Sequence, residues 1–267
     1  MSEEAVMSDA GAVDPKICQI VRQSLPQIES AFGVRILRAT EAGPRGYGAG
    51  SLDTPHDVQF AYVRKVDWYL RLTPGAEKIS LPVSPELNMT GSDIRGVLRS
   101  AQSGDFEALL NLAQGDVYFD RPEGWSECAG LITPENTRAS DFLRLRNRAV
   151  TRSRSWGFGT DQDFAEFFDV VYCLLRARWR ADRSDSLPEG IAPLIEGLED
   201  DLRADIHKLL NAKREKAETA VVPPLPRIQI FMDSEMQRLA DVSMPAPAGV
   251  ASEPFDQIFS SLVRNFG

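Results

Sequence analysis

The sequence predicts an α+β protein that has a sheet in its first half and is helical in its second half. Between residues 34 and 83, three short segments rich in β-branched and aromatic residues are separated by turn-forming residues. After about residue 120 such segments stop, and apolar residues recur at helical spacing instead. The 267 residues, of which 43% are hydrophobic, are enough for one large domain or two modest ones.

The first expected element is a helix from Pro15 to about Phe32. Asp14 suits the N-cap and Pro15 the first helical position, and apolar residues follow at helical spacing. Residues 1–14 are small and acidic, and we expect them to form a disordered leader.

Three strands and a helical tract follow this helix. The strand segments alternate or are β-branched, and Pro82 in the third indicates an edge strand or a strand end. The strands are expected at 34–39, 57–63 and 78–83, and the helical tract at 92–112. We therefore interpret residues 15–120 as a first domain.

Residues 121–242 predict a second, mostly helical domain. Its apolar tracts recur at helical spacing at 142–145, 164–179, 191–217 and 228–239. Residues 243–254 are rich in Pro, Ala, Gly and Ser, without an apolar period, and are interpreted as a linker.

The last segment, 255–267, predicts an amphipathic helix with one wholly apolar face. A helix this short is marginal in water, so the apolar face must dock on something. Docking on the protein's own body is one interpretation. Binding to a protein partner, or self-association, is the functional one. The residues of this face are Phe255, Ile258, Phe259, Leu262, Val263 and Phe266.

Charge and cysteine content narrow the classes of function. A net charge of −9 argues against sequence-independent binding along a long stretch of nucleic acid, because such binding depends on neutralising phosphates. However, ten arginines lie between residues 138 and 183, so RNA could bind this arginine-rich segment. A solvated helical face with internal ion pairs is the alternative. Three cysteines and two histidines, widely spaced, make a zinc site improbable.

The chain carries no signal for export or for membrane insertion. No apolar run approaches 18 residues, and the N-terminal segment lacks the charged and apolar regions of a signal peptide. We expect a cytoplasmic protein without membrane association.

The segment from Glu41 to Val63 carries the clearest chemical signal. A strand leads into a glycine-rich turn, and an acidic residue, Asp57, lies on the next strand. Glycines let a backbone approach phosphates, and carboxylates on alternate strand positions face one way, where they can share divalent cations.

The order of residues in this segment resembles that of the YcgL-type nucleotidyltransferases of the DNA-polymerase-beta superfamily. The resemblance extends to Asn88–Arg95, to the helical tract 98–112 and, more loosely, to residues 170–179, so it covers roughly residues 25–240. The coinciding residues of the first segment are Glu41, Gly43, Arg45, Gly48, Ser51, Asp53, Asp57, Val58, Phe60, Tyr62 and Val63.

The resemblance implies a nucleotidyltransferase-like mixed sheet with flanking helices, followed by a mostly helical C-terminal domain. It also implies a site for a nucleoside triphosphate and Mg²⁺. Asp57 would then be the catalytic metal ligand, with Asp53 a weaker candidate. The implied nucleotide-binding residues are Gly43, Arg45, Gly48 and Ser51.

The chain departs from the family pattern at the positions that bind phosphate and metal ions. Pro44 replaces a serine that helps hold phosphates in active members, Pro55 replaces the first strand carboxylate, and Asn88 falls at the third carboxylate position. Two-metal transfer needs clustered anionic oxygens around ions about 3.5–4 Å apart. We therefore expect no metal or nucleotide cofactor unless the protein is active.

Three functions follow from these observations. The first is a catalytically degraded nucleotidyltransferase-like protein that binds or regulates a protein or RNA partner. The second is an active, metal-dependent transferase that moves NMP onto RNA, protein or a small hydroxyl acceptor through Asp57. The third is a structural subunit of a larger assembly.

Overall fold

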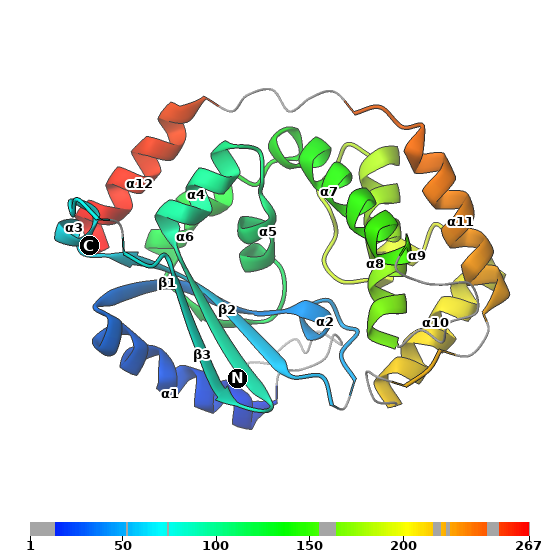
Figure 1. Cartoon of the computed structure of the whole chain (residues 1–267), viewed down its shortest axis with the longest axis horizontal. Coiled ribbons are helices and arrows are strands. Elements are labelled where there is room, and N and C mark those ends of the chain that lie inside the picture. Colours follow the sequence, from blue (N-terminus) through cyan, green and yellow to red (C-terminus); the bar gives the residue numbers. More distant parts are fainter. Residues whose placement is uncertain are drawn as a thin grey trace, which may run out of the picture.

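The computed structural model describes residues 14–51, 53–73, 75–154, 164–215, 220–222, 225–244 and 251–266. A five-stranded mixed sheet occupies one half of the molecule and a group of helices the other (Figure 1). Residues 1–13 of the leader expected at 1–14, and residues 245–250 of the linker expected at 243–254, lie outside the described residues.

Helix α1 (Pro15–Phe32) has the bounds that the sequence predicts. The Asp14 side chain caps it by accepting a hydrogen bond from the Lys16 N–H at 2.8 Å. Gly33 ends the helix in the left-handed region, with φ of 60°. Apolar residues along one face of α1 pack on the sheet, together with Ile36 of the first strand.

The sheet has the strand order β3-β4-β2-β1-β5. Only β2 and β4 run parallel, and the other neighbouring strands are antiparallel. The expected strands are confirmed, and the one containing Pro82 lies at an edge of the sheet. The strands are β1 (Val34–Ala42), β2 (His56–Arg64), β3 (Lys78–Ser84), β4 (Leu87–Asp93) and β5 (Val117–Asp120).

Strand β4 is absent from the sequence prediction because its residues do not look like those of a strand. It contains Asn88, Thr90 and Gly91 where β-branched or aromatic residues would be expected. Gly91 pairs with Phe60, whose ring lies over it: a Cβ at position 91 would be 2.2 Å from Phe60 Cε2. The ring therefore supplies the packing that glycine lacks.

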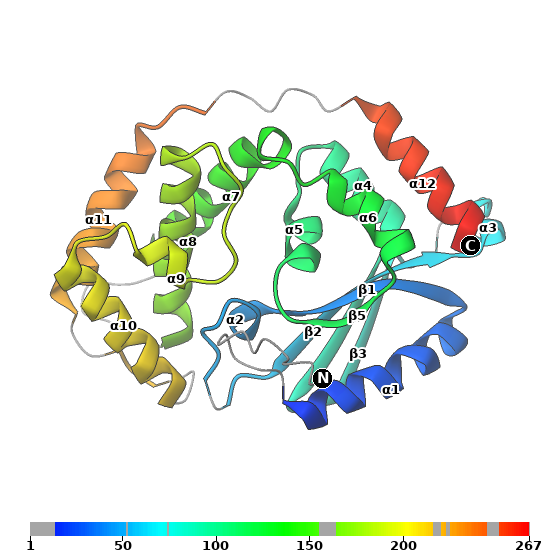
Figure 2. The ribbon, with the colours of Figure 1, turned by 180° about the vertical axis from the view of Figure 1, so that it is seen from behind.

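The second face of the sheet is covered by α4 (Ile94–Gln102), α5 (Glu107–Ala113) and α6 (Pro122–Gly130) (Figures 1 and 2). The expected continuous helical tract at 92–112 is wrong. Ser103 ends α4, and Gly104, with φ of 95°, turns the chain before α5 begins. The buried residues of α6 belong to the same core cluster, although the sequence assigned this segment to the helical half.

Helices α7 (Pro134–Arg154), α8 (Phe164–Asp182), α9 (Ala192–Ile195), α10 (Asp200–Glu215) and α11 (Pro226–Ala240) form the other half. Their apolar faces share a separate core, and α8 lies at its centre with buried residues on most of its sides. No helix in the described part of the chain is long and apolar enough to span a membrane.

Helix α12 (Ser252–Phe266) returns to the first half and packs on α4, α6 and β2 (Figure 1). Phe255, Ile258 and Leu262 are buried there, and Phe259, Val263 and Phe266 pack against the same cluster. The face expected for a partner is therefore covered by the chain itself, since the sheet's second face needs it to complete its core. The helix also begins at Ser252, inside the expected linker.

Candidate functional site

Asp57 and Asn88 lie side by side at the end of the parallel pair β2 and β4. The two residues are register partners, and Asn88 Nδ2 donates to Asp57 Oδ1 at 3.2 Å. Gly43, where β1 ends, is close: a Cβ there would be 3.5 Å from Asp57 Oδ2. Three residues that the sequence singled out separately therefore meet at one point.

These residues do not fit a pair of magnesium ions. Pro55 has no ligating side chain, and the Asn88 amide N–H occupies a carboxylate oxygen of Asp57. Asp53 is exposed, and its Oδ1 accepts a hydrogen bond from the Ser51 hydroxyl at 2.8 Å. Within the residues that the structure describes, no three His, Cys, Asp or Glu side chains gather closely enough to hold a metal ion.

A buried carboxylate, that of Glu41 on the neighbouring strand β1, contacts the Asp57 backbone and is only 2% exposed. Its Oε1 accepts the Asp57 backbone N–H at 2.9 Å, and its Oε2 accepts from His56 Nδ1 at 2.8 Å and from the Tyr118 hydroxyl. Burial and this hydrogen bond to Glu41 raise the pKa of Tyr118 above its ordinary value. Glu41 thus fixes the strand position from which Asp57 projects.

The other residues expected to bind nucleotide build the turn itself. Arg45 donates from Nε to the Thr54 carbonyl at 2.8 Å and from Nη2 to the Ser51 carbonyl at 3.0 Å. Ser51 is buried and bonded to Thr54. Gly48, with φ of 81°, accepts a hydrogen bond from Arg214 Nη2 at 3.1 Å. Of the expected set, only Gly43 adjoins Asp57.

Tyr47 connects the glycine turn to the helical half. Its ring stacks on that of Tyr172 in α8, with centroids 4.0 Å apart, and lies 6.3 Å from that of Phe168. Burial raises the pKa of Tyr47 well above its ordinary value. Beside this contact is a small pocket of about 40 Å³. Its lining includes Glu41, Gly43, Asn111, Gln114, Arg176 and Gly190.

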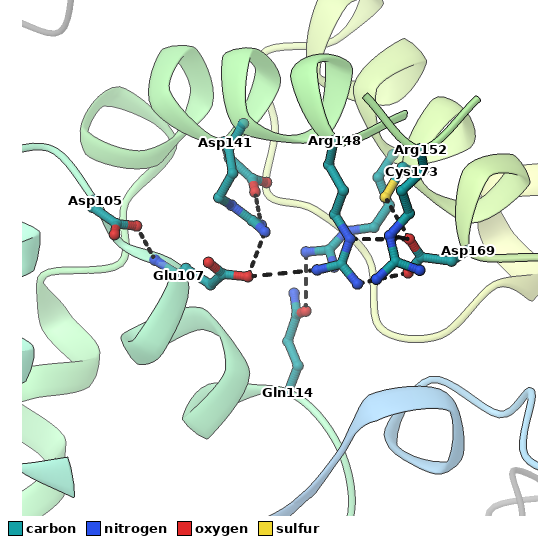
Figure 3. Close-up of polar contacts among 10 residues, drawn as sticks. Asp105, Glu107, Gln114, Asp141, Arg148, Arg152, Asp169 and Cys173 are labelled. Atoms are coloured by element: carbon teal, nitrogen blue, oxygen red, sulfur yellow. Dashed lines mark hydrogen bonds and ion pairs between the residues drawn. The ribbon is translucent and has the colours of Figure 1, made fainter. Parts of the chain in front are cut away.

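The arginine-rich segment forms a network of ion pairs between α5, α7 and α8. Figure 3 shows Arg148 and Arg152 reaching from α7 to Asp169 of α8, above Gln114. The shortest distances from Asp169 are 2.8 Å to Arg148 and 3.1 Å to Arg152. Internal ion pairs, one of the two interpretations of this segment, therefore occupy Arg148 and Arg152.

The second centre of this network is Asp141, which is 2% exposed. Arg144 Nη2 lies 2.7 Å from its Oδ1, and Arg180 Nε lies 3.0 Å from its Oδ2. Burial alone would raise the pKa of Asp141, but Arg176, Arg144 and Arg180 together hold it below its ordinary value. Glu107 of α5 adds a second partner for Arg144 at 2.7 Å.

Comparison with known proteins identifies the family of this chain. The uncharacterized protein YcgL of Bacillus subtilis (strain 168) is 25% identical over 227 residues, which are 84% of this chain and 87% of that protein. The family model RlaP, described as the RNA repair pathway DNA polymerase beta family, matches residues 17–261. The chain therefore belongs to the RNA repair pathway DNA polymerase beta family.

Proposed function

We propose that this protein is an RNA-binding member of its family that has lost two-metal nucleotidyl transfer. The observation that carries the proposal is the Asp57–Asn88 pair. The family pattern has metal-binding carboxylates at positions 55, 57 and 88, but only Asp57 is a carboxylate here, and the Asn88 amide N–H donates to it. Since position 55 is Pro55, the three positions together supply one negative charge. Two divalent cations about 3.5–4 Å apart need several anionic ligands.

The family's description supports RNA as the partner, and so does the charge around the candidate site. Around Asp141 and Asp169, five arginines and three carboxylates gather, which concentrates basic side chains in one place on an acidic protein. Such a concentration of basic side chains favours phosphate binding over a limited area. The arginines are Arg144, Arg148, Arg152, Arg176 and Arg180, and the third carboxylate is that of Glu107.

Binding titrations with and without Mg²⁺ test this proposal. Fluorescence anisotropy with short single-stranded RNA, and calorimetry with the four nucleoside triphosphates, would be measured for wild type, Asp57→Asn and Asp53→Asn. Asp53→Asn is the matched control because Asp53 is exposed on the turn. We expect RNA to bind all three proteins equally, without enhancement by Mg²⁺. Triphosphate binding that requires Mg²⁺ and is lost only in Asp57→Asn would instead establish the active transferase.

A gain-of-ligand variant tests the loss of the metal site directly. The double substitution Pro55→Asp with Asn88→Asp restores carboxylates at both altered positions. We expect Mn²⁺, followed by electron paramagnetic resonance, to bind this variant at least about tenfold more tightly than wild type, because opposed carboxylates favour a shared cation. Equal, tight binding of two Mn²⁺ ions to wild type would contradict the proposal.

A further inference from the structure

Arg176 of α8 is a buried cation that makes no ion pair within 4 Å among the described residues, although its charge helps to lower the pKa of Asp141. Its side chain is 7% exposed, and Nη2 donates to the neutral Gln114 Oε1 over a long 3.4 Å. Nε is buried and has no acceptor. The guanidinium also lies over the Tyr172 ring at 5.3 Å. An arginine does not lose its proton in a protein, so burial without a paired anion is costly.

The carboxylates of Asp141 and Asp169 are bonded to other arginines. Both oxygens of Asp141 are bonded, one to Arg144 and the other to Arg180. Asp169 is shared by Arg148 and Arg152. Neither carboxylate therefore keeps an oxygen that is free of another arginine.

Arg176 also lines the small pocket beside Gly43. On this measure of volume one water needs roughly 10–15 Å³, so a pocket of about 40 Å³ holds about three waters. That is room for one phosphoryl group but not for a nucleoside. Glu41 also lines the pocket, and its carboxylate oxygens already accept hydrogen bonds from His56, Tyr118 and the Asp57 backbone. An anion would therefore sit on the Arg176 side.

We propose that Arg176 and Gln114 hold the terminal phosphate of an RNA in this pocket. The proposal rests on the proposed RNA binding and names the group that is recognised. A guanidinium presents a planar fork of donors to phosphate oxygens. The oxygen of Gln114 accepts from Arg176, which leaves its NH₂ group to donate to the phosphate. A terminal phosphate carries about −1.5 to −2 charges, opposite in sign to the charge of Arg176.

Two substitutions test the proposal through stability and binding together. Arg176→Met removes the charge but keeps the length, and Gln114→Glu supplies the missing internal carboxylate. We expect both to raise the melting temperature without ligand, because Arg176→Met removes a buried Nε that has no acceptor and Gln114→Glu gives the guanidinium a carboxylate. Arg146→Met is the matched control, since Arg146 lies on the same network's helix α7 but is bonded only to Asn147 and packed over Phe142.

Binding would be measured with three versions of one short RNA, carrying a 5′-phosphate, a 3′-phosphate or hydroxyls at both ends. We expect wild type and Arg146→Met to prefer one phosphorylated end by at least about tenfold. Arg176→Met and Gln114→Glu should bind all three versions alike.

Two results would overturn the proposal while leaving RNA binding intact. One is equal binding of the three RNAs by wild type. The other is a lower melting temperature for both Arg176→Met and Gln114→Glu with the end preference retained, which would make Arg176 a structural cation. Failure of wild type to bind any of the RNAs would overturn the proposed function as well.

Discussion

At the scale of single residues, the carboxylate of Glu41 on β1 holds the backbone of Asp57 on the neighbouring strand. It accepts hydrogen bonds from three groups, which come from β2 and β5. A single side chain that accepts from three donors is difficult to replace, because any substitute leaves at least one donor without a partner in a buried position. Asp57 is therefore held in place whether or not it performs any chemistry.

We expect Glu41→Gln to lower the free energy of unfolding by about 2–3 kcal/mol, since hydrogen bonds to a charged acceptor are lost and the new NH₂ group faces other donors. Urea unfolding followed by circular dichroism measures this change. Glu86→Gln, at an exposed turn position, is the control and should stay within about 0.5 kcal/mol of wild type. A loss of less than about 1 kcal/mol for Glu41→Gln would show that the hydrogen-bonded network matters little.

Asp141 gives a prediction about pH. Its pKa is lower in the folded protein than in the unfolded chain, so it stabilises the fold above the unfolded value of about 3.9. That contribution is lost as the pH falls through the folded pKa. We expect Asp141→Asn to cost about 3–5 kcal/mol at pH 7, because it leaves buried arginines uncompensated. The difference from wild type should stay constant down to about pH 5 and shrink below about pH 4.

The measurement is the free energy of unfolding of wild type and of Asp141→Asn across this pH range. Asp67→Asn, at an exposed position, is the control. A difference between wild type and Asp141→Asn that grows on acidification would contradict the assigned direction of the pKa shift.

Single residues also show where prediction from sequence succeeds. The sequence identified the glycine turn, Asp57 and Asn88 one by one. The register of β2 with β4 then brings Asp57 and Asn88 together. Arg176 was counted only as one of ten arginines. No local pattern indicates that a residue lacks a partner, because that depends on which side chains of α5 and α7 arrive beside it.

At the scale of elements, α12 completes the core on one face of the sheet. The sequence predicted its apolar stripe but left open what the stripe contacts, because amphipathicity identifies a buried face and not its neighbour. The same limit applies to β4, whose packing depends on the ring of Phe60 rather than on its own side chains. The single tract expected at 92–112 failed for a local reason, since the turn at Ser103–Gly104 interrupts an otherwise regular spacing.

We expect Leu262→Ala to cost about 2–5 kcal/mol, as a buried leucine in a well-packed core does. The loss should not depend on protein concentration if α12 packs within its own chain. Equilibrium unfolding at protein concentrations spanning a hundredfold measures both quantities. Ser261→Ala, on the neighbouring and less buried face, should change stability little. A midpoint that rises with concentration would instead indicate that α12 is exchanged between two copies.

At the scale of the whole molecule, the glycine turn is shared between the two halves. Its backbone continues the sheet, while Tyr47 and Ala49 belong to the packing of the helical half. The two halves are therefore not joined only by the chain connection between α6 and α7. Any movement of one half against the other must also separate Tyr47 from Tyr172.

We expect Tyr47→Ala to lower the free energy of unfolding by about 2–4 kcal/mol and to separate the unfolding of the two halves into distinct steps. Calorimetry would detect this as a van't Hoff enthalpy below the calorimetric enthalpy. Tyr47→Phe keeps the stacked ring and should remain close to wild type, with a single transition. A single transition in Tyr47→Ala would mean that the other contacts suffice to couple the halves.

The return of α12 to the sheet has a consequence for how the protein is made. The core that it completes also contains Leu37 and residues of α6, so roughly 120 further residues must be synthesised between Gly130 and Ser252 before it can close. At about 5–20 residues per second, this takes on the order of ten seconds. During that interval part of the apolar surface on the sheet's second face stays exposed to solvent while synthesis continues, whereas α7 to α11 can already fold.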